Sequence, residues 1–234
     1  MQTESRQPEV LSQNTNETQL IHWKTCRLDY PIEVFAAAGE TINNTIIICG
    51  GCYQNDTDYT SNCYSFKEGW NNWRPHGNLT TARGYTASIA IGDMIWITGG
   101  YDGNKSLATT EQVYLNKTIQ PGPTLPQRLD SHCMADDENH IFILGGIQEW
   151  NKVTNEVLMY DKHNIFGGPN RTSPMIYGRK RHDCTIFFSQ SYGRNVLLVA
   201  GGYGRGQKSA EILDFQLGLH ASWKKSKFES SNLT

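Results

Sequence analysis

The chain has 234 residues, of which 38% are hydrophobic, 19% charged and 11% aromatic, and its formal net charge is -2. This composition is typical of a folded globular chain and excludes disordered and collagen-like proteins. A charge so near zero gives no electrostatic reason to expect a nucleic acid partner. No apolar run reaches the roughly 18 residues that a membrane span needs, so we expect no direct membrane insertion.

Two features of the sequence disagree about the compartment. The first twenty residues lack the basic start and apolar stretch of a signal peptide, and we expect residues 1–19 to be disordered. In contrast, the chain has six Cys and eight N-x-S/T sequons, where its 18 Asn and 35 Ser plus Thr would give about three by chance. We therefore expect an extracellular or secretory glycoprotein, with a cytoplasmic protein as the alternative. The candidate glycosylation sites are Asn43, Asn55, Asn78, Asn104, Asn116 and Asn170.

An internal repeat is the strongest signal in the sequence. Four Gly-Gly pairs each follow a short apolar run, and their spacings are 49, 46 and 56 residues. An aromatic residue follows the first Gly of every pair by 14 or 15 residues. The pairs are Gly50-Gly51, Gly99-Gly100, Gly145-Gly146 and Gly201-Gly202, and the aromatics are Tyr64, Tyr114, Tyr160 and Phe215. A period near 50 residues is typical of kelch repeats.

This pattern resembles the kelch family over residues 20–227. The resemblance implies four-stranded β-propeller blades, in which the Gly pair ends the second strand and the aromatic lies on the third. A Trp on the fourth strand packs against the neighbouring blade in that family, and Trp73 and Trp223 match it. The second and third blades lack this Trp, so Ile119, and Ile165 or Phe166, would have to replace it.

We therefore expect an all-β fold, a kelch-type β-propeller with about four blades in a partial ring. The blades are expected at residues 32–80, 81–127, 128–177 and 178–227, followed by a tail at 228–234. Trp23 precedes Trp73 by 50 residues, so residues 20–31 are interpreted as the outer strand of a preceding blade that is otherwise missing. In detail, the first strand of the first blade is expected at 32–38 and the last strand of the third at 164–166.

The cysteines allow two predicted disulfides. Cys52 and Cys63 flank the loop between two neighbouring strands, and Cys133 and Cys184 occupy similar inner strands of adjacent blades. Cys26 and Cys49 are then left over, Cys49 as a buried thiol. The alternative is a cytosolic protein with six unpaired cysteines. A lone CGGC at 49–52 is weak evidence for a metal, and no metal or cofactor is expected.

The candidate binding surface is one face of the ring, where the resemblance implies that partners dock. Its loops are rich in Tyr, Trp and Arg, the residue types that contribute most to protein interfaces. The candidate residues are Tyr53, Tyr59, Arg83, Tyr101, Asp102, Arg128, Trp150, Arg179, Lys180, Arg181, Tyr203 and Arg205. For each arginine, pairing with a neighbouring loop carboxylate is an equally good interpretation.

Catalytic motifs are missing from the sequence: it contains no HExxH, GxSxG or P-loop. His132 and His182 recur at the start of inner strands and are interpreted as structural residues. The sequence therefore predicts a non-enzymatic protein-interaction module with an unidentified protein partner. The alternatives are a secreted glycan-binding or catalytic propeller and a fragment of a cytosolic kelch ubiquitin-ligase adaptor.

Overall fold

The computed structural model describes residues 29–54, 57–205 and 208–226. The predicted disorder at 1–19, the strand around Trp23, the tail at 228–234, Cys26 and Asn55 lie outside these residues. The described chain is all-β and contains four four-stranded antiparallel sheets, numbered 1 to 4 here in chain order. Its only helices are short 3-10 turns, and none of them is long and apolar enough to span a membrane.

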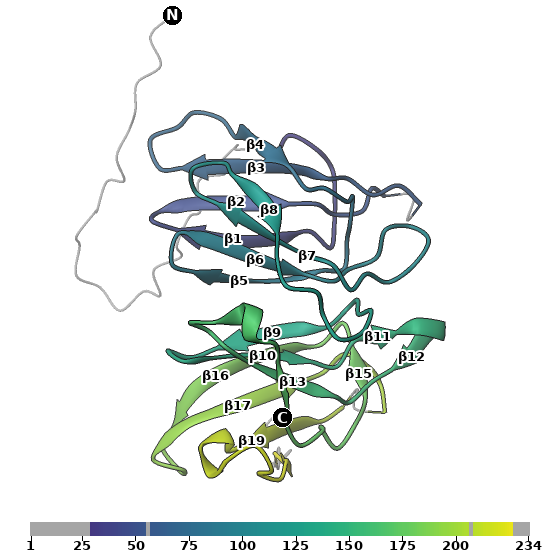
Figure 1. The fold of residues 1–234 in the computed structure, drawn as a ribbon, viewed down its shortest axis with the longest axis vertical. Helices are drawn as coiled ribbons and strands as arrows, with labels where there is room; N and C mark the ends of the chain where they lie inside the picture. Colours follow the sequence, from purple (N-terminus) through teal and green to yellow (C-terminus); the bar gives the residue numbers. More distant parts are fainter. Residues whose placement is uncertain (1–28, 55–56, 206–207, 227–234) are drawn as a thin grey trace, which may run out of the picture.

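Each sheet uses four strands that follow one another along the chain (Figure 1). Sheet 1 contains β1 (Ala38–Ile42), β2 (Thr45–Cys49), β3 (Asn62–Lys67) and β4 (Arg74–Asn78). Sheet 2 contains β5 (Ala87–Ile91), β6 (Met94–Thr98), β7 (Thr110–Tyr114) and β8 (Ile119–Pro121). Sheet 3 contains β9 (Cys133–Asp136), β10 (His140–Leu144), β13 (Val157–Asp161) and β14 (Asn170–Arg171). Sheet 4 contains β16 (Asp183–Ser189), β17 (Arg194–Ala200), β19 (Ala210–Leu213) and β20 (Lys224–Lys225).

Short elements lie in the connections between these strands. Two two-stranded ribbons form, and three 3-10 turns are present in the described chain. The ribbons are β11 (Ile147–Gln148) with β12 (Lys152–Val153) and β15 (Arg179–Lys180) with β18 (Tyr203–Gly204). The turns are η1 (Glu149–Asn151), η2 (Ile165–Gly167) and η3 (Phe215–Leu217).

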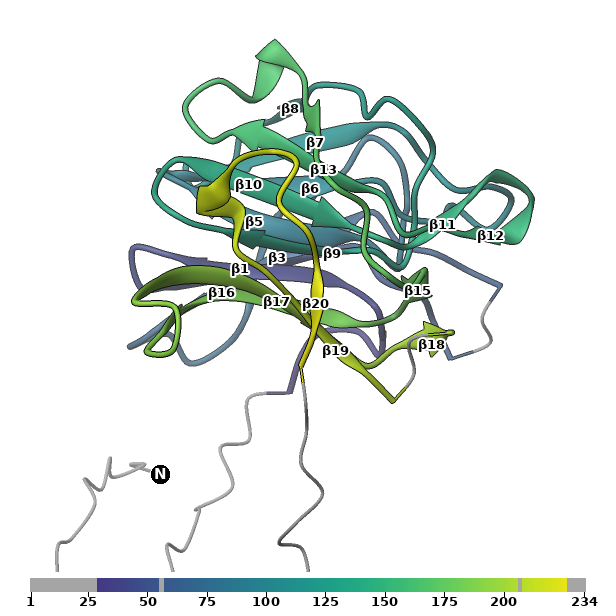
Figure 2. The same ribbon diagram turned by 90° about the horizontal axis from the view of Figure 1, so that it is seen from below.

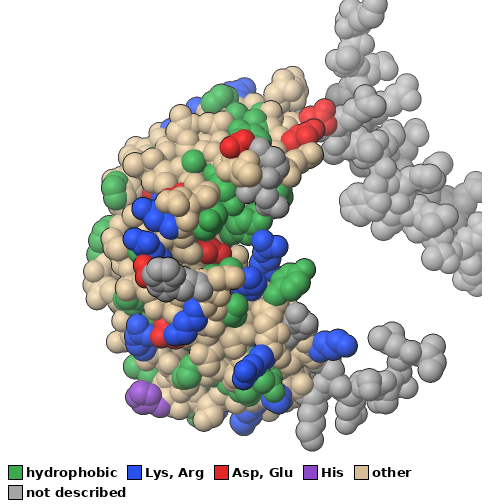
Figure 3. Space-filling view, turned by 90° about the vertical axis from the view of Figure 1, so that its right-hand side faces the viewer, with side chains coloured by type: hydrophobic (Ala, Val, Ile, Leu, Met, Phe, Trp, Pro, Cys, Tyr) green, Lys and Arg blue, Asp and Glu red, His purple; other side chains and the backbone are tan. Residues whose placement is uncertain are grey.

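The sheets follow one another along an arc. The first strands β1, β5, β9 and β16 lie side by side in that order, and Figure 1 shows sheets 1 and 2 on one side of sheets 3 and 4. Figure 2 shows the same strands from below. In the space-filling view the molecule is a crescent that is hollowed on one side (Figure 3). The four sheets thus form an open arc, with sheet 1 and sheet 4 at its two ends.

The hydrophobic core lies between the faces of successive sheets. Ile47 of sheet 1 packs in one cluster with Ile95 of sheet 2, and Trp96 of sheet 2 packs in another with Tyr160 of sheet 3. The Trp96 and Tyr160 rings meet edge to face with centroids 5.0 Å apart. Because β6 is covered on both faces, all five residues of its sequence MIWIT are buried.

One face of sheet 4 is less covered than the other. Its inner face joins sheet 3 in a third cluster that includes Leu197 and Trp223, and the Trp223 Nε1 donates to the Ser173 carbonyl at 2.9 Å. In β16, however, the side chains that point away from this cluster, those of Asp183, Thr185 and Phe187, are exposed, with Phe187 38% exposed. No further described sheet packs against this face at the end of the arc.

The Gly-Gly pairs connect each sheet to the next. In every pair the first Gly N–H donates to a carbonyl at the start of the third strand of its own sheet, either the first residue of that strand (Asn62) or the residue before it. In the first three pairs the second Gly N–H donates across to a carbonyl of the linker that leads into the next sheet. These bonds join Gly51 to Arg83 (2.8 Å), Gly100 to Leu129 (2.9 Å) and Gly146 to Arg179 (2.8 Å).

The close approach of two backbones explains why glycine is required there. Gly99 has a φ of +56°, and a Cβ at this position would lie 2.2 Å from the Leu129 carbonyl oxygen. Gly50 and Gly145 face the corresponding carbonyls at 2.4 and 2.7 Å. Gly201 has a similar φ of +69°, but no atom of the described residues lies within 4 Å of its hypothetical Cβ. The fourth pair therefore has the geometry of the others without a neighbouring sheet.

The repeat aromatics occupy related positions. Tyr64, Tyr114 and Tyr160 lie on the third strands β3, β7 and β13, whereas Phe215 lies just beyond β19 at the start of η3. Trp73 lies before β4, where its ring meets that of Tyr30 at 5.0 Å.

Two predicted strand positions differ from the structure. The first strand of sheet 1 begins at Ala38, because Phe35 belongs to the linker and forms an isolated bridge with Cys52. Residues 164–166 are not a strand, since most of them lie in η2, and the last strand of sheet 3 is β14. Both errors come from apolar residues, such as Phe35 and Ile165, that lie outside the regular ladders.

One predicted disulfide is wrong and the other is confirmed. Cys63 is bonded to Cys49, not to Cys52, because Cys49 and Cys63 are direct partners in the β2–β3 register, with Cα atoms 4.1 Å apart. Cys52 lies beyond the Gly pair, where the chain has already turned, and is fully buried. The predicted Cys133–Cys184 bond joins β9 to β16 and so fastens sheet 3 to sheet 4. Disulfides of this kind are typical of oxidising compartments.

The first prediction compares two glycines of the same motif. We expect Gly201→Ala to lower the free energy of unfolding by about 1 kcal/mol, the cost of a positive φ for a residue with a Cβ. Gly99→Ala should cost about 3 kcal/mol or more, because the new methyl group also meets the Leu129 carbonyl. Urea denaturation of both variants measures the difference. Equal losses would contradict the proposed close contact.

Candidate functional site

Four residues with left-handed backbone mark the start of the inner strands. Ala36, Tyr85, Ser131 and Arg181 have φ angles of 55°, 53°, 54° and 51°. Their backbones form a chain of hydrogen bonds from sheet to sheet: Tyr85 N donates to Ala36 O (2.9 Å), Ser131 N to Tyr85 O (2.8 Å), and Arg181 N to Ser131 O (2.8 Å). Positive φ is costly for residues with a Cβ, about 1–3 kcal/mol each, and often occurs at functional sites.

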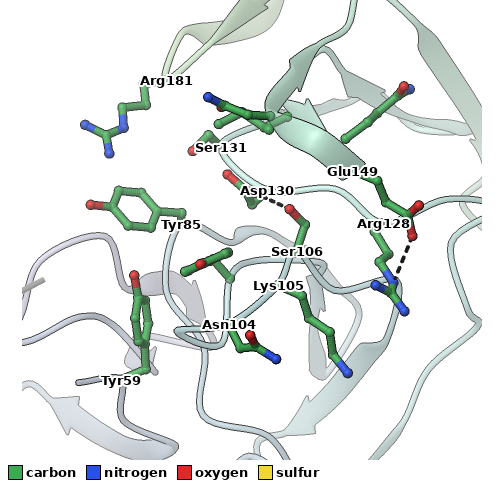
Figure 4. Close-up of a pocket in the computed structure, with 14 residues that line it drawn as sticks. Tyr59, Tyr85, Asn104, Lys105, Ser106, Arg128, Asp130, Ser131, Glu149 and Arg181 are labelled. Atoms are coloured by element: carbon green, nitrogen blue, oxygen red, sulfur yellow. Dashed lines mark hydrogen bonds and ion pairs between the residues drawn. The ribbon is translucent and has the colours of Figure 1, made fainter. Parts of the chain in front are cut away.

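A pocket of about 720 Å³ opens beside three of these residues. Tyr85, Ser131 and Arg181 contribute to its wall, and the rest comes from loops at the same end of the sheets (Figure 4). These loops are the β2–β3 loop with Tyr59, the β6–β7 loop at 101–106, the linker at 128–130 and the segment 147–151. The volume is in the range of sites that hold small molecules or peptide side chains.

Aromatic rings and a guanidinium form one side of the pocket. The Tyr59 and Tyr101 rings meet edge to face with centroids 5.7 Å apart. The Arg181 guanidinium carbon lies 4.6 Å from the centroid of the Tyr85 ring, a cation–π contact that leaves the guanidinium edge exposed. This side can therefore offer ring faces and several N–H donors to a ligand.

The other side of the pocket is more strongly paired. Ser106 Oγ donates to Asp130 Oδ2 at 2.6 Å, and both residues are buried. Arg128 Nε lies 3.3 Å from Glu149 Oε1, with both side chains about half exposed. Lys105 is exposed at the edge of the pocket. The cations that remain available to an acidic group are thus Lys105 and Arg181.

The predicted binding residues divide into two groups around this pocket. Four of them line it: Tyr59, Tyr101, Arg128 and Arg181. Tyr53, Asp102, Lys180, Tyr203 and Arg205 lie on the same loops or on neighbouring ones without lining it. Trp150 lies in η1, and its side chain is outside the described part.

Arg83 and Arg179 are buried and are not surface binding residues. Arg83 is 1% exposed and its Nη2 lies 2.9 Å from Glu111 Oε1, while its Nη1 donates to the Gly99 and Thr109 carbonyls. Burial lowers the pKa of Arg83, and the Glu111 charge opposes this shift. Arg179 repeats the arrangement with Glu211 in sheet 4, with both side chains fully buried. Their prediction as partner contacts was wrong because each turns inward to a carboxylate of its own sheet.

The carboxylates also fix the linker backbone. Glu111 accepts hydrogen bonds from the Thr80 and Thr81 amides at 2.7 and 3.3 Å. Glu211 accepts in the same way from Ile176 and Tyr177 at 2.6 and 3.2 Å. Each carboxylate thus holds the linker that leads into its own sheet.

Two buried histidines lie next to the pocket residues in sequence. His132 bonds through Nε2 to Thr98 Oγ1 at 2.8 Å, and burial lowers its pKa to about 3. Burial also lowers the pKa of His182 to about 4, with the Arg179 charge acting in the same direction. Both are neutral at physiological pH. In the described residues no group of three or more His, Cys, Asp or Glu side chains is placed to hold a metal.

Sequence reasoning missed most of the polar lining. The residues not predicted are Tyr85, Asn104, Lys105, Ser106, Asp130, Ser131, Ile147, Gln148, Glu149 and Asn151. A signal did exist for Tyr85 and Ser131, since they recur with the period of the Gly pairs. Their side chains differ in type, so the sequence does not reveal that these positions share one backbone conformation.

Comparison with known proteins gives a distant relative. No family model matches the chain. A curated protein of Caenorhabditis elegans, "Spermatocyte protein spe-26", is 24% identical over 205 residues. The match covers 84% of this chain and 34% of that protein, so the chain spans about a third of the length of this relative.

The second prediction compares a buried and an exposed carboxylate. We expect Glu111→Gln to lower the free energy of unfolding by about 3–5 kcal/mol, because it leaves the Arg83 charge buried and unpaired. Glu149→Gln should cost less than about 1 kcal/mol, because its pair with Arg128 is exposed to water. Thermal and urea unfolding would measure both. A mild effect at Glu111 would contradict a structural role for this pair.

Proposed function

We propose that the four sheets are consecutive blades of a kelch-type β-propeller. The proposal is supported by the regular spacing of the Gly-Gly pairs, by the hydrogen bonds that they make to the next sheet, and by the chain of left-handed residues at the inner strands. The same features repeat in four sheets of four antiparallel strands that follow one another along the arc. Further blades would occupy the open side of the crescent.

We further propose that the chain is a non-enzymatic protein-binding module, and that the partner binds at the pocket described above. The observation that carries this proposal is a concave site of about 720 Å³ lined by three tyrosines and two exposed arginines. Tyr and Arg are the residue types that dominate binding energy at interfaces. The left-handed residues at the base of the site hold its shape in advance, which lowers the entropy lost on binding.

An extracellular or secretory location fits this module best. Two disulfides join Cys49 to Cys63 and Cys133 to Cys184, and the chain has a high number of sequons. A glycan is a second candidate ligand, because tyrosine faces beside the amides of Gln148 and Asn151 suit the apolar faces and hydroxyl groups of sugars. Both candidate ligands, a protein and a glycan, would bind at the same pocket.

The third prediction tests the pocket with a matched pair of arginines. Arg181 stacks on Tyr85 inside the pocket, and Arg74 stacks on Trp70 away from it at 4.1 Å. Both arginines are exposed, so Arg181→Glu and Arg74→Glu make the same chemical change on similar contacts. We expect Arg181→Glu to weaken partner binding by at least about 2 kcal/mol, or roughly thirtyfold, and Arg74→Glu to leave it unchanged.

The measurement is quantitative mass spectrometry of proteins captured from extracellular fluid by the wild-type chain and the two variants, with a glycan array as a parallel assay. Proteins retained by wild type and Arg74→Glu but lost by Arg181→Glu support the protein-binding proposal. Array binding that is lost in the same pattern favours the glycan instead. Capture that is equal in all three chains, with no array signal, contradicts the use of this pocket.

A further inference from the structure

The sequons differ in their position relative to the pocket. In the described residues five candidate Asn side chains are exposed. Asn43 and Asn116 lie in the turns at the other end of sheets 1 and 2, and Asn78 and Asn170 lie on the outer strands β4 and β14. Asn104 is the one of these five that lines the pocket. Protein binding alone does not explain why a sequon lies at the pocket.

The β6–β7 loop holds Asn104 in a defined place. The Asp102 carboxylate accepts hydrogen bonds from the Asn104 and Lys105 amides, both at 2.8 Å. Gly103 lies against the Tyr59 ring, since a Cβ on it would be 3.3 Å from a ring carbon. Figure 4 shows the Asn104 side chain at the edge of the pocket between Tyr59 and Lys105. Any group attached to this amide nitrogen therefore starts beside the tyrosines.

We infer that Asn104 carries an N-linked glycan whose first N-acetylglucosamine units lie against Tyr59 and Tyr101 and cover the pocket. The two rings are 5.7 Å apart and are both only partly buried, so they offer apolar surface to the sugar. Lys105 and Arg181 can donate hydrogen bonds to the sugar oxygens. The glycan would occupy the space that the partner needs. The inference that the glycan blocks the partner rests on the proposed function, whereas the inference about where the sugar lies does not.

The modification has a simple chemical balance. An oligosaccharide is transferred from a lipid-linked diphosphate donor to Asn104 Nδ2 by the oligosaccharyltransferase of the secretory pathway. A bond forms between the anomeric carbon and the nitrogen, the anomeric carbon–oxygen bond to the diphosphate breaks, and the amide proton leaves with the released diphosphate. Because Ser106 of the sequon is buried and donates to Asp130 in the folded chain, transfer must precede folding of this loop.

Incomplete modification would give two forms of the protein. The form without sugar at Asn104 has an open pocket and binds the partner. The form with sugar has a closed pocket and does not bind it. Site occupancy during synthesis, and not a conformational change, would then set the fraction of active protein.

The first test measures where the sugar lies. The chain is expressed in a secretory host, and release of each glycan by peptide-N-glycosidase is followed by mass spectrometry under native and denaturing conditions. We expect the Asn116 glycan, in an exposed turn, to be released from the native protein. The Asn104 glycan should be released only after denaturation. An unmodified Asn104 beside a modified Asn116, or equal native release at both sites, would overturn the inference.

The second test measures access to the pocket without using a partner. Hydroxyl-radical oxidation of Tyr59 and Tyr101 is compared in wild type, Asn104→Gln and Asn116→Gln. Tyr192, which lies in the β16–β17 turn and does not line the pocket, is the internal reference. The Asn104 side chain makes no hydrogen bond in the described structure, so its replacement should leave the fold intact. We expect oxidation of the two tyrosines to rise severalfold in Asn104→Gln and to stay unchanged in Asn116→Gln. No rise in Asn104→Gln would overturn the inference.

The two proposals fail separately in these experiments. If Asn104→Gln exposes the tyrosines and the Arg181→Glu substitution in that background removes no captured protein, the glycan inference stands and the protein-binding proposal fails. If partner capture depends on Arg181 but is the same with and without the Asn104 glycan, the protein-binding proposal stands and the glycan inference fails.

Discussion

One backbone hydrogen bond, repeated between sheets, organises this molecule. The second Gly of a pair donates its N–H to a carbonyl of the next linker, as Gly100 does to Leu129. The distance is possible only because the first Gly has no Cβ, which would otherwise overlap the same carbonyl. Apolar packing between sheets supplies most of the stabilisation, but it is not directional. The glycine turn therefore fixes the distance between neighbouring sheets and their relative position along the strand direction.

The same linkers build the candidate site. Each linker offers a carbonyl to the Gly pair of the preceding sheet, and its left-handed residue joins the chain of hydrogen bonds that runs from sheet to sheet. The residue before the left-handed one pairs with a loop of the linker's own sheet, as Gly84 does with Tyr101. Buried carboxylates such as that of Glu111 accept hydrogen bonds from the linker backbone and so fix its position. The hydrogen bonds and backbone angles of the pocket therefore repeat from sheet to sheet, while its side chains differ. Such a site can acquire a new ligand without a change in the fold.

The sequence predicts the strands well because the Gly pairs and the apolar runs before them report backbone geometry directly. It could not choose between Cys49 and Cys52 as the partner of Cys63, since both flank the same turn and only the strand register separates them. It also could not tell the buried Arg83 from an exposed arginine, because the paired carboxylate is 28 residues away. The left-handed position of Tyr85 was hidden by the variety of side chains at equivalent sites.

The most direct test of this account is amide hydrogen exchange at the second glycine of each pair. The N–H groups of Gly51, Gly100 and Gly146 donate to the next linker, whereas among the described residues Gly202 has no such linker to reach. We expect the first three amides to exchange only through large-scale unfolding and the Gly202 amide to exchange rapidly. Similar protection at all four glycines, or rapid exchange at Gly100 and Gly146, would contradict the central role of this hydrogen bond.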